Sequence, residues 1–327
     1  MSTTYPPFDP EQLDRDLRPL YLERRAGGSE PLGPDTYLAK RAWDLDVTPP
    51  LDQVIAGRAV VWEDRVVPGP PGEPGVPIAV IRPAAGLTTP AAVYYIHGGG
   101  MYMGTRFLFL DALVDLVDAH GITVVSVEYR LAPEHPHPAP VEDSYAGLVW
   151  TAQNAADLGI DPRRVLVLGA SAGGGIAAGV ALLARDRGGP AIAGQALYCP
   201  MLDDRNNTVS ARQHYHMAGW DGAANHWGWR FLLGDDAGGS DVSPYAAPAR
   251  ARDLSALPPA FIDVGECEVF RDEAVDYASR IWAEGGQAEL HVWAGAYHGF
   301  TTDLPESTIC RAAQAARTSW IMRVLDL

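Results

Sequence analysis

A serine between two glycines is the feature of the sequence that most directly suggests chemistry. Ser171 lies in the segment Gly169-Ala-Ser-Ala-Gly173, which fits the pattern G-x-S-x-G and follows the apolar run 165–168. A sharp turn from a strand into a helix requires small residues two positions before and after its central residue. Such a turn exposes the serine hydroxyl above a helix amino terminus, where negative charge is favoured. The segment predicts a nucleophilic serine, with a plain glycine-rich turn as the alternative.

A second glycine-rich segment could bind the negative charge that a serine attack creates. His97-Gly98-Gly99-Gly100 follows the apolar run 92–96. Backbone N–H groups can point into a site at close range where the residues carry no Cβ atom, so this loop can offer donors to an oxyanion. A flexible loop is the alternative. However, an HGGG segment accompanies G-x-S-x-G in lipases and esterases, so the two motifs together indicate acyl transfer.

An acid and a histidine follow in the chain order serine, acid, histidine. Glu268 and Asp272 both come after the expected strand 260–264, and His298 comes after the expected strand 289–293. On the loop after the last strand, His298 can take a proton from Ser171. Asp272 falls at the expected start of a helix, where an ion pair or a helix-terminus charge would account for it. We therefore expect Glu268 to be the acid.

With these motifs in this order, the sequence resembles the bacterial hormone-sensitive-lipase-like (family IV) esterases of the α/β-hydrolase fold over residues 63–300. The segments that carry the resemblance are Glu63-Asp64-Arg65 with Pro68-Gly69-Pro70, His97 to Gly100, Glu128 to Pro136, Gly169 to Gly174, and Tyr297 to Phe300. The first looks like the family's opening strand. The segment 128–136 matches its YRLAPEHP motif, which implies a structural role in supporting the active-site loops.

The resemblance implies a role for each matched residue. Ser171 would be the nucleophile and His298 the general base and acid. Glu268 takes the place of the family's usual aspartate, and Ala170 stands where the family typically has Asp, which leaves the hydrogen-bond network of this loop open. The implied oxyanion donors are the N–H groups of Gly99, Gly100 and Ala172, and the residues that support the motifs are His97, Gly98, Gly169 and Gly173.

The segments between the motifs alternate between buried strands and amphipathic helices. The expected strands are 78–81, 92–96, 123–127, 165–168, 195–199, 260–264 and 289–293, and the expected helices are 107–119, 141–156, 174–187, 271–284 and 306–324. Repeated strand–helix units predict an α/β fold with a mostly parallel sheet that is flanked by helices. In such sheets ligands bind at the carboxyl ends of the strands, which is where the motif residues fall.

Two segments do not follow the alternation and are candidates for a cap over the strand ends. Residues 1–45 are expected to form an N-terminal helical cap, in which Asp9-Pro10-Glu11 opens a helix leading into Leu13, Leu17 and Tyr21. Residues 46–327 would form the catalytic domain. Within it, residues 203–245 carry Trp220, Trp227 and Trp229 and are expected to contribute to the pocket or the cap.

Composition excludes several classes of protein. The chain has 327 residues, enough for a large core, and a net charge of −16, which disfavours binding to nucleic acid or to an anionic membrane. No stretch of 18 apolar residues occurs, and the first residues lack a signal-peptide pattern. Three cysteines at no zinc-like spacing indicate reduced thiols. We therefore expect a cytoplasmic protein that acts on a small molecule; a homodimer stays open.

Two competing interpretations have weaker support. Gly173 to Ala178 fits G-x-G-x-x-A, a dinucleotide-binding pattern, but no acidic residue ends the next expected strand. His214 and His216 could share one face of a strand as metal ligands, but no third ligand lies at a suitable spacing, so pocket or surface histidines are expected.

The sequence thus predicts a serine carboxylesterase that hydrolyses short- to medium-chain esters through an acyl-enzyme, without a metal or an organic cofactor. No exposed apolar lid for lipid interfaces is expected. An amidase or a lactonase with the same triad is the first alternative. A non-catalytic ligand receptor on this fold, like the plant gibberellin receptors, is the second, although those receptors lack the catalytic histidine and His298 is present here.

Overall fold

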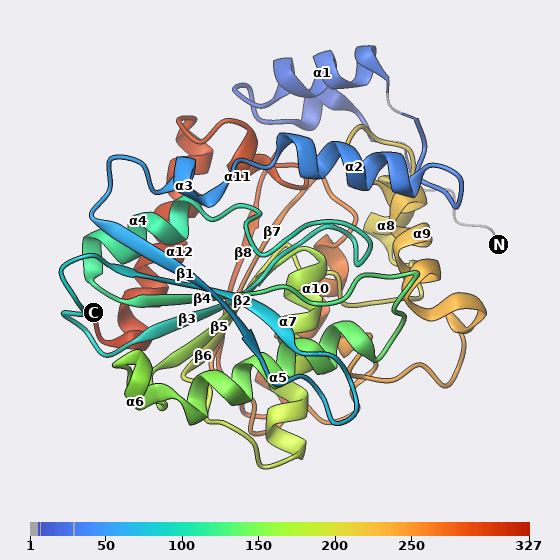
Figure 1. Cartoon of the computed structure of the whole chain (residues 1–327). Helices are drawn as coiled ribbons and strands as arrows, with labels where there is room; N and C mark the ends of the chain where they lie inside the picture. The colour runs from blue at the N-terminus through green and yellow to red at the C-terminus, as the bar shows by residue number, and fades with distance from the viewer. Residues whose placement is uncertain (1–5, 7, 29) are drawn as a thin grey trace.

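A single twisted sheet of eight strands runs through the molecule (Figure 1). The computed structural model describes residues 6, 8–28 and 30–327. Residues 1–5, to which the expectation about a signal peptide applies, lie outside the described residues. The strands are β1 (Val60–Val67), β2 (Val76–Pro83), β3 (Ala92–Ile96), β4 (Thr123–Val127), β5 (Val165–Ala170), β6 (Gly194–Tyr198), β7 (Ala260–Gly265) and β8 (Ala288–Trp293).

Most of the sheet is parallel. Its strand order is β1-β2-β4-β3-β5-β6-β7-β8, and β2 alone pairs antiparallel, with β1 on one side and β4 on the other. All the remaining neighbours pair in parallel. The carboxyl ends of β3 and of β5 to β8 therefore share one edge, and the glycine loop, the serine, the acid and the histidine all follow these ends.

Helices cover both faces of the sheet. The longer helices are α1 (Arg18–Gly27), α2 (Tyr37–Val47), α4 (Asp111–His120), α5 (Ala139–Gln153), α7 (Ala172–Asp186), α9 (Gly222–Leu233), α10 (Arg271–Ala283) and α12 (Thr308–Leu325). The short ones are α3 (Leu51–Val54), α6 (Ala155–Leu158), α8 (Val209–Gln213), α11 (Phe300–Asp303) and the 3₁₀ turns η1 (Pro10–Gln12), η2 (Gly234–Asp236) and η3 (Pro248–Arg250).

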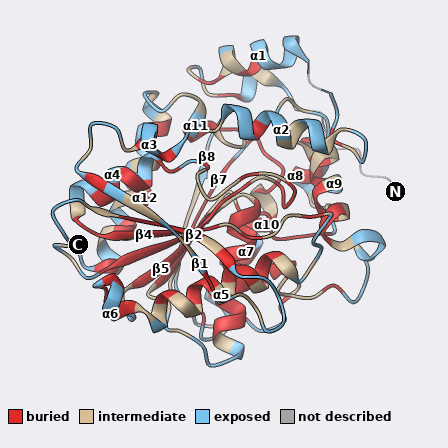
Figure 2. Ribbon diagram, viewed as in Figure 1, coloured by how far each residue is buried: buried red, intermediate tan, exposed pale blue. Residues whose placement is uncertain are grey.

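The two faces of the sheet form separate apolar layers, because successive strand residues point to opposite sides. Val167 belongs to a layer with α5, α7 and α10, whereas its neighbour Leu166 packs with α4 and α12. The sheet and the inward sides of these helices are buried, while α1 and α2 present an exposed outer side (Figure 2). Every strand expected from the sequence is present, which confirms the α/β prediction with its mostly parallel sheet.

The N-terminal helix begins later than the sequence predicts. Asp9 caps only the 3₁₀ turn η1, because Leu13 has an extended backbone (φ −68°, ψ 147°) and the next N–H, that of Asp14, donates to Gly295 O at 2.9 Å. Helix α1 therefore starts at Arg18. The expected apolar residues are nevertheless buried: Leu17 and Tyr21 pack with Tyr297 and Phe300 in one cluster.

The expected helix 107–119 also starts later, at Asp111. Phe109 has a positive φ of 58°, which is outside the range of a right-handed helix, so the chain turns at 105–110 before α4 begins. The expected helix 141–156 is two helices, α5 and α6, interrupted at Asn154.

Both segments that depart from the strand–helix alternation contact the carboxyl edge of the sheet. Tyr21 of α1 lies 5.8 Å from Tyr297, measured between ring centroids, and accepts a hydrogen bond from Ala218 N. In α2, Tyr37 contacts Phe231 of α9, with 5.1 Å between the ring centroids. Figure 1 shows α1, α2, α8 and α9 next to one another at one side of the sheet.

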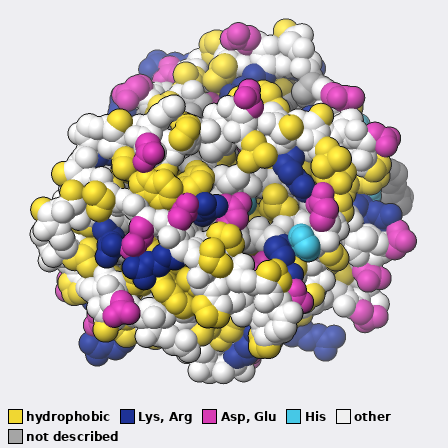
Figure 3. Space-filling model, viewed as in Figure 1, with side chains coloured by type: hydrophobic (Ala, Val, Ile, Leu, Met, Phe, Trp, Pro, Cys, Tyr) yellow, Lys and Arg dark blue, Asp and Glu magenta, His cyan; other side chains and the backbone are white. Residues whose placement is uncertain are grey.

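The surface of α2 differs from expectation. Leu38, Trp43, Leu45 and Val47 are 50 to 65% exposed. Leu38 and Leu45 are seven positions apart and Trp43 and Val47 four apart, so the two pairs lie on different sides of the helix and cannot all face the body of the protein. The sequence prediction of no exposed apolar lid is therefore wrong for this helix. Elsewhere, acidic and basic side chains are interspersed on the face seen in Figure 3.

A buried ion pair joins the sheet to the last helix. Arg317 of α12 donates to both carboxylate oxygens of Asp263 in β7, at 2.8 and 3.1 Å, and its guanidinium lies 4.0 Å from the ring centroid of Tyr198. Trp293 Nε1 also donates to Asp263 at 3.2 Å. The pair thus connects β6, β7, β8 and α12.

We predict that Arg317→Ala lowers the free energy of unfolding by about 3–5 kcal/mol, because it leaves the Asp263 carboxylate buried without its partner. Urea denaturation measures the change. Arg323→Ala is the matched control on the same helix: its side chain is 60% exposed and its pair with Glu289 should contribute less than about 1 kcal/mol. Equal losses for the two variants would contradict the role given to the buried pair.

Candidate active site

Ser171 lies at the tip of a strained turn between β5 and α7. Its φ of 57° and ψ of −121° are unusual for a residue with a side chain. Two hydrogen bonds hold this backbone: Ser171 N donates to Tyr198 O at 2.8 Å, and Met201 N donates to Ser171 O at 3.0 Å. The turn that follows β6 therefore fixes the nucleophile candidate in place.

The two glycines of the motif are required by close backbone contacts. A Cβ atom on Gly169 would lie 2.1 Å from Gly173 O, and one on Gly173 would lie 2.1 Å from Ile96 O. Gly174 and Gly175 likewise approach the backbone of Pro200 and Met201. These glycines pack against the chain's own backbone, so their presence needs no bound dinucleotide.

His298 connects the serine with a buried acid. Its Nε2 lies 3.0 Å from Ser171 Oγ, and its Nδ1 lies 2.9 Å from Glu268 Oε2. The Glu268 side chain is 1% exposed and the His298 side chain 14%. Phe270 packs its ring edge-on to the imidazole, with 5.2 Å between centroids. The geometry is that of a serine–histidine–carboxylate triad.

The second acid candidate has other partners. Asp272 Oδ2 accepts a hydrogen bond from Ser210 N at 2.7 Å, and its Oδ1 accepts one from Arg271 Nε at 2.8 Å. Asp272 thus ties α10 to α8. The next residue, Glu273, is buried and accepts hydrogen bonds from the N–H groups of Leu202 and Asp203, at 2.7 and 3.2 Å. Of the three acids, only Glu268 has a hydrogen bond to His298 among the described residues.

The surroundings of His298 favour its charged form. Burial alone would lower the pKa of the imidazole, because it removes water from the charged ring. Cys199 and Glu268 act in the opposite direction, and the pKa of His298 lies well above its ordinary value of 6.5. An imidazolium that forms during a reaction is therefore stabilised in place.

Three backbone N–H groups near Ser171 are unused. Gly99 and Gly100 have positive φ angles of 110° and 59°, and Ala172 is the first residue of α7, where N–H groups have no acceptor within the helix. Within residues 8–28 and 30–327, none of the three N–H groups has a hydrogen-bond acceptor. The expected oxyanion donors are thus available to a ligand.

The segment 128–136 supports the glycine loop. Tyr129 Oη donates to His97 O at 2.9 Å, and its ring stacks on the His97 imidazole with 4.1 Å between centroids. Arg130 forms two hydrogen bonds of 2.8 Å to the buried Asp143, and Ala132 N donates to Met101 O at 2.9 Å. These contacts agree with the supporting role that the family resemblance implies for this segment.

Known proteins resemble this chain in sequence and fold. The family model for the alpha/beta hydrolase fold matches residues 93–302, which include the glycine loop and the residues of the triad. The chain belongs to the alpha/beta hydrolase family. The resemblance to its hormone-sensitive-lipase-like esterases is confirmed by the named relatives.

Relatives and solved structures are named as esterases. The carboxylesterase NlhH of Mycobacterium tuberculosis is 38% identical over 244 residues, which are 73% of this chain and 75% of that protein. Among solved structures, a bacterial heroin esterase superposes with a TM-score of 0.88 at 34% identity, covering 96% of this chain and 98% of the other. The esterase LipW from Mycobacterium marinum superposes with a TM-score of 0.86 at 34% identity, covering 97% and 98%.

Sequence reasoning missed one residue of this hydrolase's site and did not place another. Cys199, which follows β6, has a side chain close to both His298 and Glu268. Trp220 lies over the glycine loop: a Cβ on Gly100 would be 2.2 Å from its ring, and its centroid is 6.4 Å from that of His298. The odd cysteine count and the tryptophan-rich segment were the only sequence signals for them.

His214 and His216 are not brought together with a third ligand in the described part of the chain. His214 is buried and packs edge-on to Phe8, with 5.3 Å between the ring centroids. Burial, with a contribution from Arg271, lowers the pKa of His214 to about 4. His214 is therefore a buried histidine that packs against the N-terminal segment.

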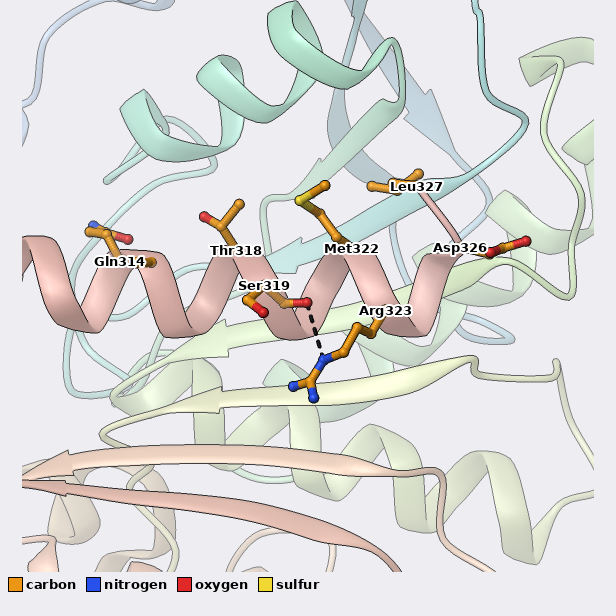
Figure 4. Close-up of a pocket in the computed structure, with 8 residues that line it drawn as sticks. Gln314, Thr318, Ser319, Met322, Arg323, Asp326 and Leu327 are labelled. Atoms are coloured by element: carbon orange, nitrogen blue, oxygen red, sulfur yellow. Dashed lines mark hydrogen bonds between the residues drawn. The ribbon is translucent and has the colours of Figure 1, made fainter.

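A shallow surface groove along α12 lies away from the triad (Figure 4). Its lining includes Met322, Asp326 and Leu327. Arg164, which directly precedes β5, donates to Asp326 O at 2.9 Å, so this groove lies at the amino edge of the sheet. Ser171 follows the carboxyl end of the same strand.

Among the residues described, no helix has both the length and the apolar composition needed to cross a bilayer.

We predict that Glu268→Gln lowers the pKa of His298, because it removes a negative charge that stabilises the imidazolium. Histidine NMR titration of the wild type and the variant measures the change. His214 is the internal control, since its pKa of about 4 is set by burial and by Arg271 rather than by Glu268. An unchanged titration of His298 would contradict this electrostatic role for Glu268.

Proposed function

We propose that the protein is a serine carboxylesterase. Ser171 Oγ attacks the carbonyl carbon of an ester while His298 Nε2 takes the hydroxyl proton. The N–H groups of Gly99, Gly100 and Ala172 stabilise the oxyanion of the tetrahedral intermediate. His298 then protonates the leaving alcohol, which gives the acyl-enzyme, and the same imidazole activates the water that releases the acid. The observation that carries this proposal is the continuous contact from Ser171 through His298 to Glu268, at 3.0 and 2.9 Å.

The role of Glu268 is to hold the imidazole. Its hydrogen bond to Nδ1 keeps the proton on that nitrogen, so that Nε2 presents a lone pair to Ser171, and its charge stabilises the imidazolium. Glu268 replaces the family's usual aspartate, and its longer side chain provides the reach to His298. The names of the relatives, which are carboxylesterases and esterases, support hydrolysis of a carboxylic ester.

We further propose that α1, α2 and the segment 203–245 form a cap that limits the depth of the pocket. Trp220 supports this: it covers Gly100 and stacks on Tyr102, with 6.5 Å between the ring centroids. Bulky aromatic walls of this kind favour short and medium acyl chains. The cytoplasmic location and the absence of a cofactor remain part of the proposal, and a homodimer stays open.

The same triad could cleave an amide or a lactone, which is the alternative from the same reaction class. Matched ester and anilide substrates with one acyl group separate these activities. A non-catalytic receptor is disfavoured, because His298 is present and lies within hydrogen-bond distance of Ser171.

The first prediction from the proposed function concerns the nucleophile. Ser171→Ala should lower kcat for p-nitrophenyl esters by about 10⁶-fold, to the residual rate that the N–H groups and substrate binding alone provide. Circular dichroism checks that the variant is folded. Near wild-type turnover by the folded variant would refute the proposed function.

The second prediction separates the two acids. Glu268→Gln should lower kcat on the order of 10⁴-fold, because the imidazole loses its tautomer control and the charge that stabilises it. Asp272→Asn is the matched control and should change kcat less than about tenfold, since an amide oxygen can still accept from Ser210 N. A crippled Asp272→Asn beside an active Glu268→Gln would reverse the assignment.

The third prediction concerns acyl length. Esters with acyl chains of roughly two to eight carbons should be hydrolysed faster than long-chain esters, because the cap closes a pocket of limited depth. Initial rates on a series of p-nitrophenyl esters, with Ser171→Ala as the background, provide the measurement. Faster turnover of a triolein-like emulsion than of butyrate esters would contradict this prediction.

A further inference from the structure

Cys199 is held beside the triad by its backbone. It has a positive φ of 38°, which side-chain-bearing residues adopt only where the surroundings impose it. Cys199 N donates to Asp263 O at 2.7 Å. The nearby residues Tyr198 and Met201 form backbone hydrogen bonds with Ser171. The thiol is therefore placed by the strained turn itself and is partly accessible.

Three side chains in this region offer different metal-ligand atoms. The thiol of Cys199, the carboxylate of Glu268 and the imidazole of His298 each contribute one atom, and these atoms lie within 4.8 Å of one another. Ligands of a tetrahedral zinc ion are about 3.4–3.7 Å apart, given the usual zinc–ligand bond lengths. Small side-chain rotations would bring the three atoms to that spacing.

A second observation points to a missing partner at the same place. Glu268 Oε1 is buried and has no hydrogen-bond partner among the described residues. Because the side chain is only 1% exposed, water has little access to this oxygen. A buried carboxylate oxygen without a donor or a cation is costly. Thiolate, imidazole and carboxylate together form a ligand set that suits zinc and the softer cadmium ion.

We propose that Cys199, Glu268 and His298 form an inhibitory site for a divalent cation of the zinc type. On binding, the thiol releases its proton to solvent, and the cation forms bonds to the Cys199 sulfur, the free Glu268 oxygen and one nitrogen of His298. Two negative ligands balance the charge of the cation. The binding itself is independent of the reaction, whereas the inhibition rests on the proposed esterase function.

A cation bound to either imidazole nitrogen of His298 prevents the ring from acting as the general base. A cation on Nε2 occupies the lone pair that would accept the Ser171 proton. A cation on Nδ1 displaces the proton there, and the neutral ring then carries its proton on Nε2, which faces Ser171 Oγ as a donor. In both cases His298 can no longer act as the general base.

Direct binding is tested by titrating the full chain with Cd²⁺ and following the cadmium–thiolate absorption in the ultraviolet. We expect one strongly bound ion per chain, with the band lost in Cys199→Ser and retained in Cys310→Ser. Cys310 is a buried thiol of α12 that donates to Phe300 O at 3.2 Å and lies outside the cluster of Cys199, Glu268 and His298. His298→Ala should weaken binding at least about tenfold, since it removes one of three ligands. A band that persists in Cys199→Ser, or wild-type affinity in His298→Ala, would overturn the site.

Inhibition is tested with Zn²⁺ on ester hydrolysis, with each variant normalised to its own metal-free rate. Zn²⁺ should inhibit the wild type, EDTA should restore the rate, and Cys199→Ser should require at least about tenfold more Zn²⁺ for half-inhibition. Equal inhibition of both proteins would overturn the proposal. If the wild type shows the cadmium band but hydrolyses no ester, the proposed function fails while the cation site stands.

Discussion

Close backbone packing around Ser171 is the constraint on which the site depends. The amino end of α7 lies so near β3 that a Cβ on Gly173 would be 2.1 Å from Ile96 O and 2.4 Å from His97 O. A Cβ on Gly98 would in turn be 2.9 Å from Ala170 O. These two close approaches position the serine and the amides of the glycine loop relative to each other. Because backbone atoms make these contacts, they leave little freedom for the relative placement of the proposed nucleophile and oxyanion donors.

A similar contact brings the acid and the histidine together. The loops after β7 and β8 meet where a Cβ on Gly265 would be 2.4 Å from Ala296 O, and Cys267 N donates to the same oxygen at 2.8 Å. Gly295 N donates to Glu266 Oε2 at 3.0 Å. The buried pair of Asp263 and Arg317 anchors β7 below these loops. The proposed triad is therefore assembled from two halves, each held by backbone contacts at the carboxyl edge of the sheet.

What the sequence predicted correctly has a local physical signature. Apolar runs bounded by turn residues marked the buried strands, and G-x-S-x-G and HGGG reflect backbone contacts that exclude side chains. The failures have tertiary causes. The helix expected from Asp9 is diverted because Asp14 N bonds to Gly295 O, from the far end of the chain. Glu273 lies in the expected helix 271–284 with no local sequence signal of burial, yet it accepts hydrogen bonds from the N–H groups of residues 202 and 203. The position of Cys199 depends on the pairing of β6 with β7.

A glutamate at position 268, where the family usually has aspartate, affects more than the distance that the side chain spans to His298. One carboxylate oxygen bonds to His298, while the other is buried without a partner among the described residues. The pKa of His298 is raised by Cys199 and by Glu268, whose carboxylate has no other hydrogen-bond donor among the described residues. In the proposed mechanism, the charge that stabilises the imidazolium during acyl transfer also keeps more of the free enzyme protonated in acid, where Nε2 has no lone pair for Ser171. The protonation of His298 therefore depends on Cys199 and Glu268 as well as on the imidazole itself.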